Sequence, residues 1–544
     1  MRVLYTLLLI VFFDIALGAD LEKKYFIGFT DKDNTPFTVE EPLAYLSQKS
    51  IDRREKYSIP IIKQDLPVDP NYIRRVVGMG AKILNQTKWM NGITVIANED
   101  IIPSIEQLSF VREVKYIGDI EERNETVDRK FGEADPENKI IPLKSDINYG
   151  SGFTQINMIK GDVLHEQGYR GEDMLVAVID GGFKDLYLTR VLRALIDENR
   201  IIATQDFVYP KNTNVFSKST HGTRVLSTMA AYFPGEFVGT APKAKYVLLR
   251  SEDVGSETLI EEYNWVSAAE YADSIGCDLV NSSLGYVDFD KSIWNHTYSS
   301  MTSDQNVISI GATIAESKGM MIVNSNGNEG NEVLYRNLSA PADALNIIAV
   351  GAVDNEGEYS SLSSLGYTYD GRVNPGICTV GENAIIALRE NVFGGNGTSY
   401  SSPIAAGVIT CLMQKYKYVP LDKIREAIYR SSHKYSDPDA QYGYGIPDFS
   451  KVQEILTKES KEVSYNIYPN PCHNRLIISC KEIQYEPSHI KIYNIEGELI
   501  FERVDFIEKG GMVLDGVISS ISKGIYFIKI ESMGKLSMEK IVIL

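Results

Sequence analysis

The spacing of apolar residues divides the chain into three regions of different character. From Tyr25 to Gly118, short apolar runs (YFIGF, GITVIA, VREVKYIG) alternate with stretches of helical periodicity such as NYIRRVVGMG and IIPSIEQL. Strands and helices mixed over about a hundred residues predict a small α+β domain. The next segment, from Asp119 to Lys139, is rich in charged residues and is predicted to be an exposed linker.

The central region, from about Asn148 to Lys458, is predicted to be an α/β domain. Apolar strands such as MLVAVID, KYVLLR, DLVNSS and MMIVNS alternate there with longer helical segments. Continuously apolar strands are typical of a mainly parallel sheet that helices cover on both faces. In such sheets ligands bind beyond the carboxyl ends of the strands, and Asp180 and Asn281 fall at those ends.

The final region contains short strands and no helical periodicity. Its apolar runs LIISC, IKIYN, ELIFERV, GIYFIKI and KIVIL are separated by Gly, Pro, Asn and Glu. This pattern predicts a small all-β domain, a β-sandwich.

The amino terminus has the features of a secretory signal peptide. Arg2 precedes an apolar stretch, and Ala16 and Gly18 have the spacing of a signal-peptidase site. Asp14 interrupts the apolar run, and no later stretch reaches the ~20 residues that a transmembrane helix needs. We therefore expect residues 1–18 to be a signal peptide, the protein to be exported, and no stable membrane span.

Composition narrows the class of protein further. The chain has 544 residues, with 44% hydrophobic and 24% charged residues, which is the balance of a soluble multidomain protein. Its formal charge of −18 makes nucleic-acid binding a poor prediction, and solubility outside the cell explains the acidity better than a preference for basic substrates. Five cysteines can form two pairs at most; whether Cys472 and Cys480 pair is left open.

Two residues of the central region are candidates for acid–base chemistry. Asp180 ends an apolar strand and precedes Gly181 and Gly182, a pattern that alone fits a plain turn or a nucleotide site as well. His221, in Ser-Thr-His-Gly-Thr, opens a predicted helix, and histidine is the side chain best suited to act as a general base near neutral pH.

Two further residues are candidates for acyl transfer. Ser399 lies in Asn-Gly-Thr-Ser-Tyr-Ser-Ser-Pro, in the first turn of a predicted helix, where a serine is more often only a cap. The glycine turn before it and the small residues Ala405, Ala406 and Gly407 after it favour a catalytic role. Asn328, in Asn-Gly-Asn-Glu-Gly, follows an apolar strand; its amide could form a turn or donate a hydrogen bond to an oxyanion.

The order of these motifs carries more information than any one of them. The segments VAVIDGGF, STHGTRV, VNSSLGY, NSNGNEG and GTSYSSPIAAG resemble, in order and character, the five signature blocks of the subtilisin-like (S8) serine peptidases. The resemblance covers about residues 145 to 457. It implies a secreted serine endopeptidase with an α/β fold that needs no cofactor for its chemistry and acts on protein or peptide substrates.

The resemblance also implies a role for each matching residue. Ser399 would attack the peptide carbonyl, His221 would act as general base and acid, Asp180 would orient the imidazole, and Asn328 would stabilise the oxyanion. Substrate would bind as an added β-strand. Its binding site would comprise Ser283, Leu284 and Gly285 on one side, and Ser325, Asn326 and Gly327 as the opposite wall of the first specificity pocket.

Three residues depart from the family pattern. Gly181 stands where Thr or Ser usually follows the aspartate, Arg224 follows His-Gly-Thr where a smaller or aromatic residue is common, and Tyr400 replaces a common Met. These departures concern the surroundings of the triad and the specificity, because the predicted triad itself is complete.

The flanking regions complete the predicted domain organisation. Residues 19–118 resemble the inhibitory and chaperone prosegments of S8 peptidases from Bacteroidetes, with a permanent substrate-binding domain as the alternative. Residues 119–145 would form the linker and processing region, and residues 146–457 the peptidase. Residues 458–544 resemble the sorting domain of the type IX secretion system, with an adhesive or stabilising β-sandwich as the alternative.

Two other functions are considered for the central domain. A catalytically inactive surface-binding module would be free to lose triad residues, yet all are present. A nucleotide-binding α/β protein would need a glycine-rich phosphate loop, and the sequence has none.

Structural calcium occurs in related enzymes and is kept open, but no Asp-rich loop has a spacing specific enough to name ligands. The expected location is outside the cell or on its surface.

Overall fold

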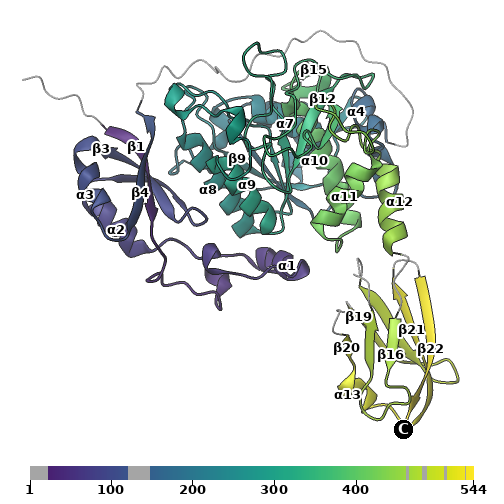
Figure 1. Ribbon diagram of the computed structural model, residues 1–544. Coiled ribbons are helices and arrows are strands. Elements are labelled where there is room, and N and C mark those ends of the chain that lie inside the picture. Colours follow the sequence, from purple (N-terminus) through teal and green to yellow (C-terminus); the bar gives the residue numbers. More distant parts are fainter. Residues whose placement is uncertain are drawn as a thin grey trace, which may run out of the picture.

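The computed structural model describes residues 22–120, 147–212, 214–460, 465–480, 487–505, 507, 511–532 and 535–544. The predicted signal peptide 1–18 and nearly all of the predicted linker 119–145 lie outside these residues. Figure 1 shows an amino-terminal domain beside a large central domain, and a carboxyl-terminal domain that follows the last central helix. The fold is thus built from three parts, as the apolar pattern predicts.

The central domain contains a seven-stranded sheet in the order β13-β12-β11-β10-β5-β9-β6, and every pairing in it is parallel. This confirms the predicted α/β class. The strands are β5 (Leu175–Asp180), β6 (Ile201–Asp206), β9 (Lys245–Arg250), β10 (Leu279–Ser282), β11 (Met321–Ser325), β12 (Ile348–Val353) and β13 (Ile377–Val380).

Helices cover both faces of this sheet. Side chains of β5 alternate between two apolar cores: Val176 and Val178 belong to one, and Ala177 and Ile179 to the other. The first core includes α7 (His221–Ala230) and α10 (Thr398–Lys415), and the second includes α8 (Ile260–Ile275) and α9 (Val307–Ser317). Burial on both faces explains why the strands read as continuously apolar.

Shorter elements surround the sheet. They are the helices α4 (Phe153–Met158), α5 (Asp162–Glu166), α6 (Arg193–Asp197), α11 (Leu421–Ser431) and α12 (Phe449–Ser460), and the strand pairs β7 (Tyr232–Phe233) with β8 (Phe237–Val238) and β14 (Ala384–Leu388) with β15 (Asn391–Gly395). Helix α12 runs three residues past the predicted end of the peptidase domain at 457.

The amino-terminal domain is a four-stranded antiparallel sheet in the order β2-β3-β1-β4. Its elements are β1 (Glu22–Phe29), α1 (Gln48–Lys56), α2 (Pro70–Gly78), β2 (Lys82–Thr87), β3 (Gly92–Asn98), α3 (Ile102–Glu106) and β4 (Val111–Asp119). Strand β2, KILNQT, is largely polar and is not predicted by the apolar pattern. Strand β4 includes Asp119, so this residue belongs to the sheet rather than to the linker.

The sheet of this domain packs on helix α8 of the central domain. The rings of Phe26 and Tyr263 stack with their centroids 4.5 Å apart. Phe26, Trp89 and Ile117 belong to the same apolar core as α8, so part of the core of the central domain is contributed by the amino-terminal domain. Two domains that share a core form one closely packed unit.

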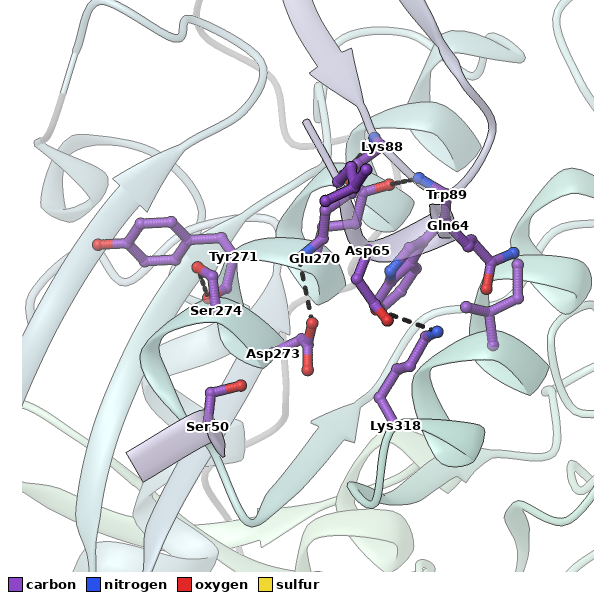
Figure 2. Close-up of polar contacts among 12 residues, drawn as sticks. Ser50, Gln64, Asp65, Lys88, Trp89, Glu270, Tyr271, Asp273, Ser274 and Lys318 are labelled. Carbon is purple, nitrogen blue, oxygen red and sulfur yellow. Dashed lines mark hydrogen bonds and ion pairs between the residues drawn. The ribbon is translucent and has the colours of Figure 1, made fainter. Parts of the chain in front are cut away.

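Buried ion pairs reinforce this contact (Figure 2). The carboxylate of Asp273, near the end of α8, is fully buried and pairs with Arg53, Arg54 and Lys88 of the amino-terminal domain at N–O distances of 2.5, 2.9 and 3.1 Å. Burial alone would raise the pKa of Asp273, but the three cations hold it below the ordinary value.

A second carboxylate on α8 accepts hydrogen bonds from the same domain. Glu270 accepts bonds from the hydroxyl of Thr87 and from the backbone N–H groups of the next two residues, at 2.5, 2.8 and 2.9 Å. Lys318, which follows α9, pairs with the buried Asp65 at 3.0 Å, and Figure 2 shows this pair near Glu270. The polar contact therefore extends across both helices.

The carboxyl-terminal domain has two antiparallel sheets, β16-β17-β20 and β19-β18-β21-β22, around one apolar core. This agrees with the predicted β-sandwich. Its elements are β16 (Tyr465–Tyr468), β17 (Ile477–Cys480), β18 (Ser488–Tyr493), β19 (Leu499–Asp505), β20 (Met512–Val513), α13 (Asp515–Ile518), β21 (Gly524–Ser532) and β22 (Lys535–Ile543). All five cysteines are buried and free, so Cys472 and Cys480 do not pair.

Candidate active site

Asp180 is held at the end of β5 with its side chain completely buried. Its carboxylate accepts a hydrogen bond of 2.7 Å from the backbone N–H of Gly181. Glycine at this position removes the hydroxyl that the family pattern usually supplies. Gly181 therefore supports the carboxylate through its backbone N–H, although it has no side-chain hydroxyl.

His221 begins helix α7 and faces this carboxylate. Ser219 accepts a hydrogen bond from the backbone N–H of His221 at 3.1 Å, and the ring Nδ1 lies 2.9 and 3.0 Å from the two oxygens of Asp180. The helix approaches closely because position 222 is glycine: a Cβ there would stand 2.5 Å from the backbone oxygen of Gly182. An Nδ1–carboxylate bond leaves Nε2 for proton exchange.

Ser399 lies in the first turn of α10 and is 8% exposed. The preceding glycine, Gly397, has φ of 141°, a conformation that favours glycine. The hydroxyl of Ser283 donates to the backbone oxygen of Ser399 at 2.9 Å, which ties β10 to the start of α10. The serine is therefore presented on a constrained turn at the carboxyl edge of the sheet.

Asn328 is oriented by the residue before Ser399. Its side-chain oxygen accepts hydrogen bonds of 2.9 Å from both the backbone N–H and the hydroxyl of Thr398. Because the oxygen accepts these two hydrogen bonds, the side-chain NH₂ group of Asn328 points away from Thr398 and can donate to another acceptor. Asn328 and Ser399 line the same cavity, as a donor and a nucleophile acting on one carbonyl should.

This cavity measures ≈ 550 Å³ and contains most of the predicted substrate contacts. The predicted residues in its lining are Ser283, Leu284, Gly285, Ser325, Gly327, Asn328 and Ser399. Asn326 is not in the lining: it is fully buried, donates to the backbone oxygen of Ser364 at 2.7 Å and accepts from Asn374 at 3.0 Å. It supports the wall from behind. Asp180 and His221 also lie outside this lining.

The sequence reasoning missed the acidic character of the cavity. Five acidic residues line it, and only Glu329 lies inside a recognisable block, next to Asn328; the others are Glu252, Glu257, Asp288 and Asp290. The position of Glu329 in the sequence, directly after Asn328, could therefore have indicated that it lies at the cavity. The other four come from two loops that no motif connects.

Two of the residues that depart from the family pattern, Tyr400 and Arg224, lie near His221. Tyr400 places its ring 6.0 Å from the ring of His221, centroid to centroid, and burial raises the pKa of its hydroxyl. Arg224 is almost fully buried, and its charge acts on Tyr400. Both residues belong to the packing around the histidine.

One group of carboxylates has the spacing of a cation site. Among the described residues, oxygens of Glu252, Glu257 and Glu261 lie within 4.8 Å of one another. Glu261 also accepts a bond of 3.1 Å from the backbone N–H of Thr258, and Glu252 one from the hydroxyl of Tyr286. Such clusters are common without an ion, so structural calcium stays open.

An Asp–His pair, a helix-borne serine and an oriented amide on an α/β fold are the groups that define the subtilisin class of hydrolases. The family model of the subtilases (Peptidase S8) matches residues 171–445, just over half of the chain. The chain therefore belongs to the subtilase family of serine peptidases.

Two more family models match the flanking regions. The Peptidase S8 propeptide domain of Bacteroidota matches residues 24–131, and a secretion system C-terminal sorting domain matches residues 466–544. The first match extends past the predicted prosegment boundary at 118. Together the propeptide and the type IX sorting tail indicate secretion to the cell surface or outside. Within the described part of the chain, no helix combines the length and apolar character that crossing a membrane requires.

The chain is also similar to individual proteins of known name. The chain is 29% identical over 296 residues to Subtilisin NAT of Bacillus subtilis subsp. natto, covering 54% of this chain and 68% of that protein. It is 28% identical to the membrane-bound transcription factor site-1 protease of Mus musculus, covering 56% of this chain and 27% of the relative. A crystal structure of MycP1 without its propeptide aligns at a TM-score of 0.43 and 20% identity, over 55% of this chain and 96% of that one.

Proposed function

We propose that this protein is an active secreted serine endopeptidase whose acyl-enzyme forms on Ser399. The observation that carries the proposal is the buried hydrogen bond between His221 and Asp180, 2.9 Å long, at the sheet edge where Ser399 is exposed to the cavity. The carboxylate fixes the tautomer of the imidazole and stabilises the imidazolium that forms when the serine loses its proton.

The remaining groups support the developing charge. The NH₂ of Asn328 and the backbone N–H of Ser399 donate to the oxygen of the tetrahedral intermediate. An extended substrate lies between the segment Ser283–Gly285 and the opposite wall formed by Ser325 and Gly327, pairing with their backbone as an added strand. His221 then returns its proton to the leaving amine, and water hydrolyses the acyl-enzyme.

The amino-terminal domain acts as an inhibitory prosegment in this proposal. It packs on α8 through a shared core and buried ion pairs, and the fold ends at Asp119, which pairs with Lys291 near the cavity rim. Asp119, the last residue of β4, thus lies beside the loop that carries Asp290. The acidic rim residue Asp290 is the immediate neighbour of Lys291. In this proposal the enzyme itself removes the prosegment.

The test uses residues 19–460, which include all of α12, as the wild type, as Ser399→Ala and as Ser401→Ala. Ser401 is a matched control, because it lies in the same helix, is buried, and donates only to the backbone oxygen of Thr398 one turn back. Loss of the prosegment is followed on a gel, and the active serine is labelled with a fluorophosphonate probe.

We expect the wild type and Ser401→Ala to lose the prosegment and to be labelled, and Ser399→Ala to do neither. Removing the nucleophile of such a triad lowers kcat about 10⁴-fold or more. If none of the three proteins is processed or labelled, the alternative of an inactive surface-binding module that retains the peptidase fold replaces this proposal.

A further inference from the structure

The cavity that contains Ser399 is strongly one-sided in charge. Its lining includes five carboxylates, and among the described residues that line it there is no Lys, Arg or His. A cleft lined by one sign of charge concentrates the electrostatic field and attracts ligands of the opposite sign. The chain as a whole carries 55 basic side chains, so their absence from this lining is a local property rather than a consequence of composition.

The near end of the cavity, next to Asn328, contains a carboxylate at the wall of the first specificity pocket. A Cβ at Gly327 would stand 2.3 Å from an oxygen of Glu329 and 2.7 Å from the hydroxyl of Ser339. These two groups therefore lie directly beside the wall that the substrate side chain must pass. Burial raises the pKa of Glu329, although the hydroxyl of Ser364 donates to it at 2.5 Å.

A second observation at the same place indicates a ligand with hydrogen-bond donors. The hydroxyl of Ser339 is fully buried, lines the cavity and has no hydrogen-bond partner within the described part of the chain. A buried polar group without a partner is unfavourable by about 1–3 kcal/mol until one arrives. An ammonium offers three donors and a guanidinium five, enough to satisfy the serine and the carboxylate together.

The far end of the cavity has its own acidic rim. The loop that contains Glu257 and the loop that contains Asp290 are joined by two hydrogen bonds of 2.8 and 2.9 Å. Asp288 and Asp290 are exposed. The neighbouring Lys291 is directed to Asp119 and Tyr116 of the amino-terminal domain, and it does not line the cavity.

From these contacts we propose that the cavity selects polypeptides with Lys or Arg immediately before the scissile bond, bound by Glu329 and Ser339. The acidic rim of Asp288 and Asp290 favours a second basic residue further toward the amino terminus of the substrate. This inference rests on the proposed endopeptidase function and assigns a substrate class to the same site. The match of charge and of donors to acceptors, rather than pocket size, determines the selection.

The experiment measures kcat/KM of the mature enzyme, produced from the full chain, on quenched-fluorescent peptides. One peptide set varies only the residue before the scissile bond among Lys, Arg, norleucine and Glu; a second set varies a residue nearer the amino terminus. The variants are Glu329→Gln and the pair Asp288→Asn with Asp290→Asn. Each new amide can accept the hydrogen bond that its carboxylate accepts now from Ser364, Asn295 or the Glu257 N–H.

We expect the wild type to prefer Lys and Arg over norleucine, and Glu329→Gln to reduce that preference about tenfold, the size of one well-placed charge contact. The rim pair should lower the preference at the distal position by roughly threefold, because exposed charges are screened by solvent. Asp422→Asn, an exposed acid on α11 outside the lining, is the control and should change neither preference.

Fluorophosphonate labelling separates the two proposals. A wild type that is labelled but prefers norleucine, or a labelled Glu329→Gln that keeps the full preference for Lys, overturns the substrate assignment while leaving the peptidase intact. An unlabelled wild type overturns both.

Discussion

The two ends of helix α8 lie next to two acidic regions, and only one of them has cations that compensate its charge. Near its carboxyl end, Asp273 is completely buried, and three cations of the amino-terminal domain compensate its charge at hydrogen-bonding distance. Near its amino end, Glu257 belongs to a cavity rim with the exposed Asp288 and Asp290, and the lining contributes acids without bases.

The difference is between a charge that is compensated within the chain and charges that face solvent. Buried charges require a compensating partner in the same structure, because leaving one uncompensated is strongly unfavourable. Exposed acids at a cavity rim are solvated by water, so they need no cation from the protein and can bind a cationic ligand. The charge of Asp273 is thus compensated for as long as the amino-terminal domain is attached, while the rim acids face solvent. Each prediction below tests one side of this contrast.

The largest effect is expected from Asp273→Ala. This change leaves Arg53, Arg54 and Lys88 buried without their shared carboxylate, and breaking a buried ion pair in this way destabilises by about 3–5 kcal/mol. In the Ser399→Ala background, which prevents processing, amide protection in α1 should fall by roughly a hundredfold or more, a factor that follows from the same energy. Hydrogen exchange measures it.

Glu426→Ala is the control for this prediction. Its carboxylate forms an exposed pair with Arg430 at 3.9 Å on α11, and such pairs contribute no more than about 1 kcal/mol. Equal protection of α1 in Asp273→Ala and in the parent protein would show that the ion pairs do not hold the domain in place.

Whether a contact can be predicted from the sequence depends on how far apart its residues lie along the chain. Strand β5 and helix α7 are recognisable because their patterns are local, so Asp180 and His221 can be assigned from a few neighbouring residues. Arg53 and Asp273 lie 220 residues apart, and nothing in either local pattern indicates that they meet. The polar strand β2 is missed for a related reason: Asn85 is buried because its amide finds Phe207 and Asn264 in the other domain.

The cavity that contains Ser399 shows the same limit within a single domain. Ser325, Gly327 and Asn328 are found through one sequence block. Asp288 and Asp290, in contrast, line the cavity only because their loop is folded against the loop of Glu257. The sequence also led us to attribute the acidity of the chain to solubility. The fold concentrates part of that acidity around Ser399, which no residue count can reveal.

An intermediate effect is expected from acid pH on the domain contact. The cations hold the pKa of Asp273 below its ordinary value in the docked state, although burial opposes them. A depressed pKa means that docking is favoured while the carboxylate is ionised, above its ordinary pKa of about 3.9, and that this contribution is lost as the pH falls through the depressed value.

Glu270 acts with the opposite sign, because burial raises its pKa in the docked state, so its contribution is present at low pH and is lost as the pH rises through the raised value. The Glu270→Gln variant in the Ser399→Ala background removes this opposing contribution. Protection factors of α1, corrected for intrinsic exchange, should then decrease between pH 5 and pH 3, by about tenfold for each unit of pKa displacement. Constant protection over this range would contradict the role given to Asp273.

The smallest effect, and the one that compares both regions directly, is expected from salt. Raising the ionic strength from 0.02 to 0.5 M shortens the Debye length from about 20 Å to about 4 Å, which screens exposed charges but scarcely affects buried pairs. We expect kcat/KM for a peptide with two lysines to fall by roughly three- to tenfold, while that for a neutral peptide changes little. Over the same range, protection of α1 in Ser399→Ala should stay within about twofold, because Asp273 and its cations are removed from solvent. If the two quantities respond equally to salt, the distinction between the buried ion pairs of Asp273 and the solvated cavity rim fails. Both acidic regions must then be treated as ordinary surface charge.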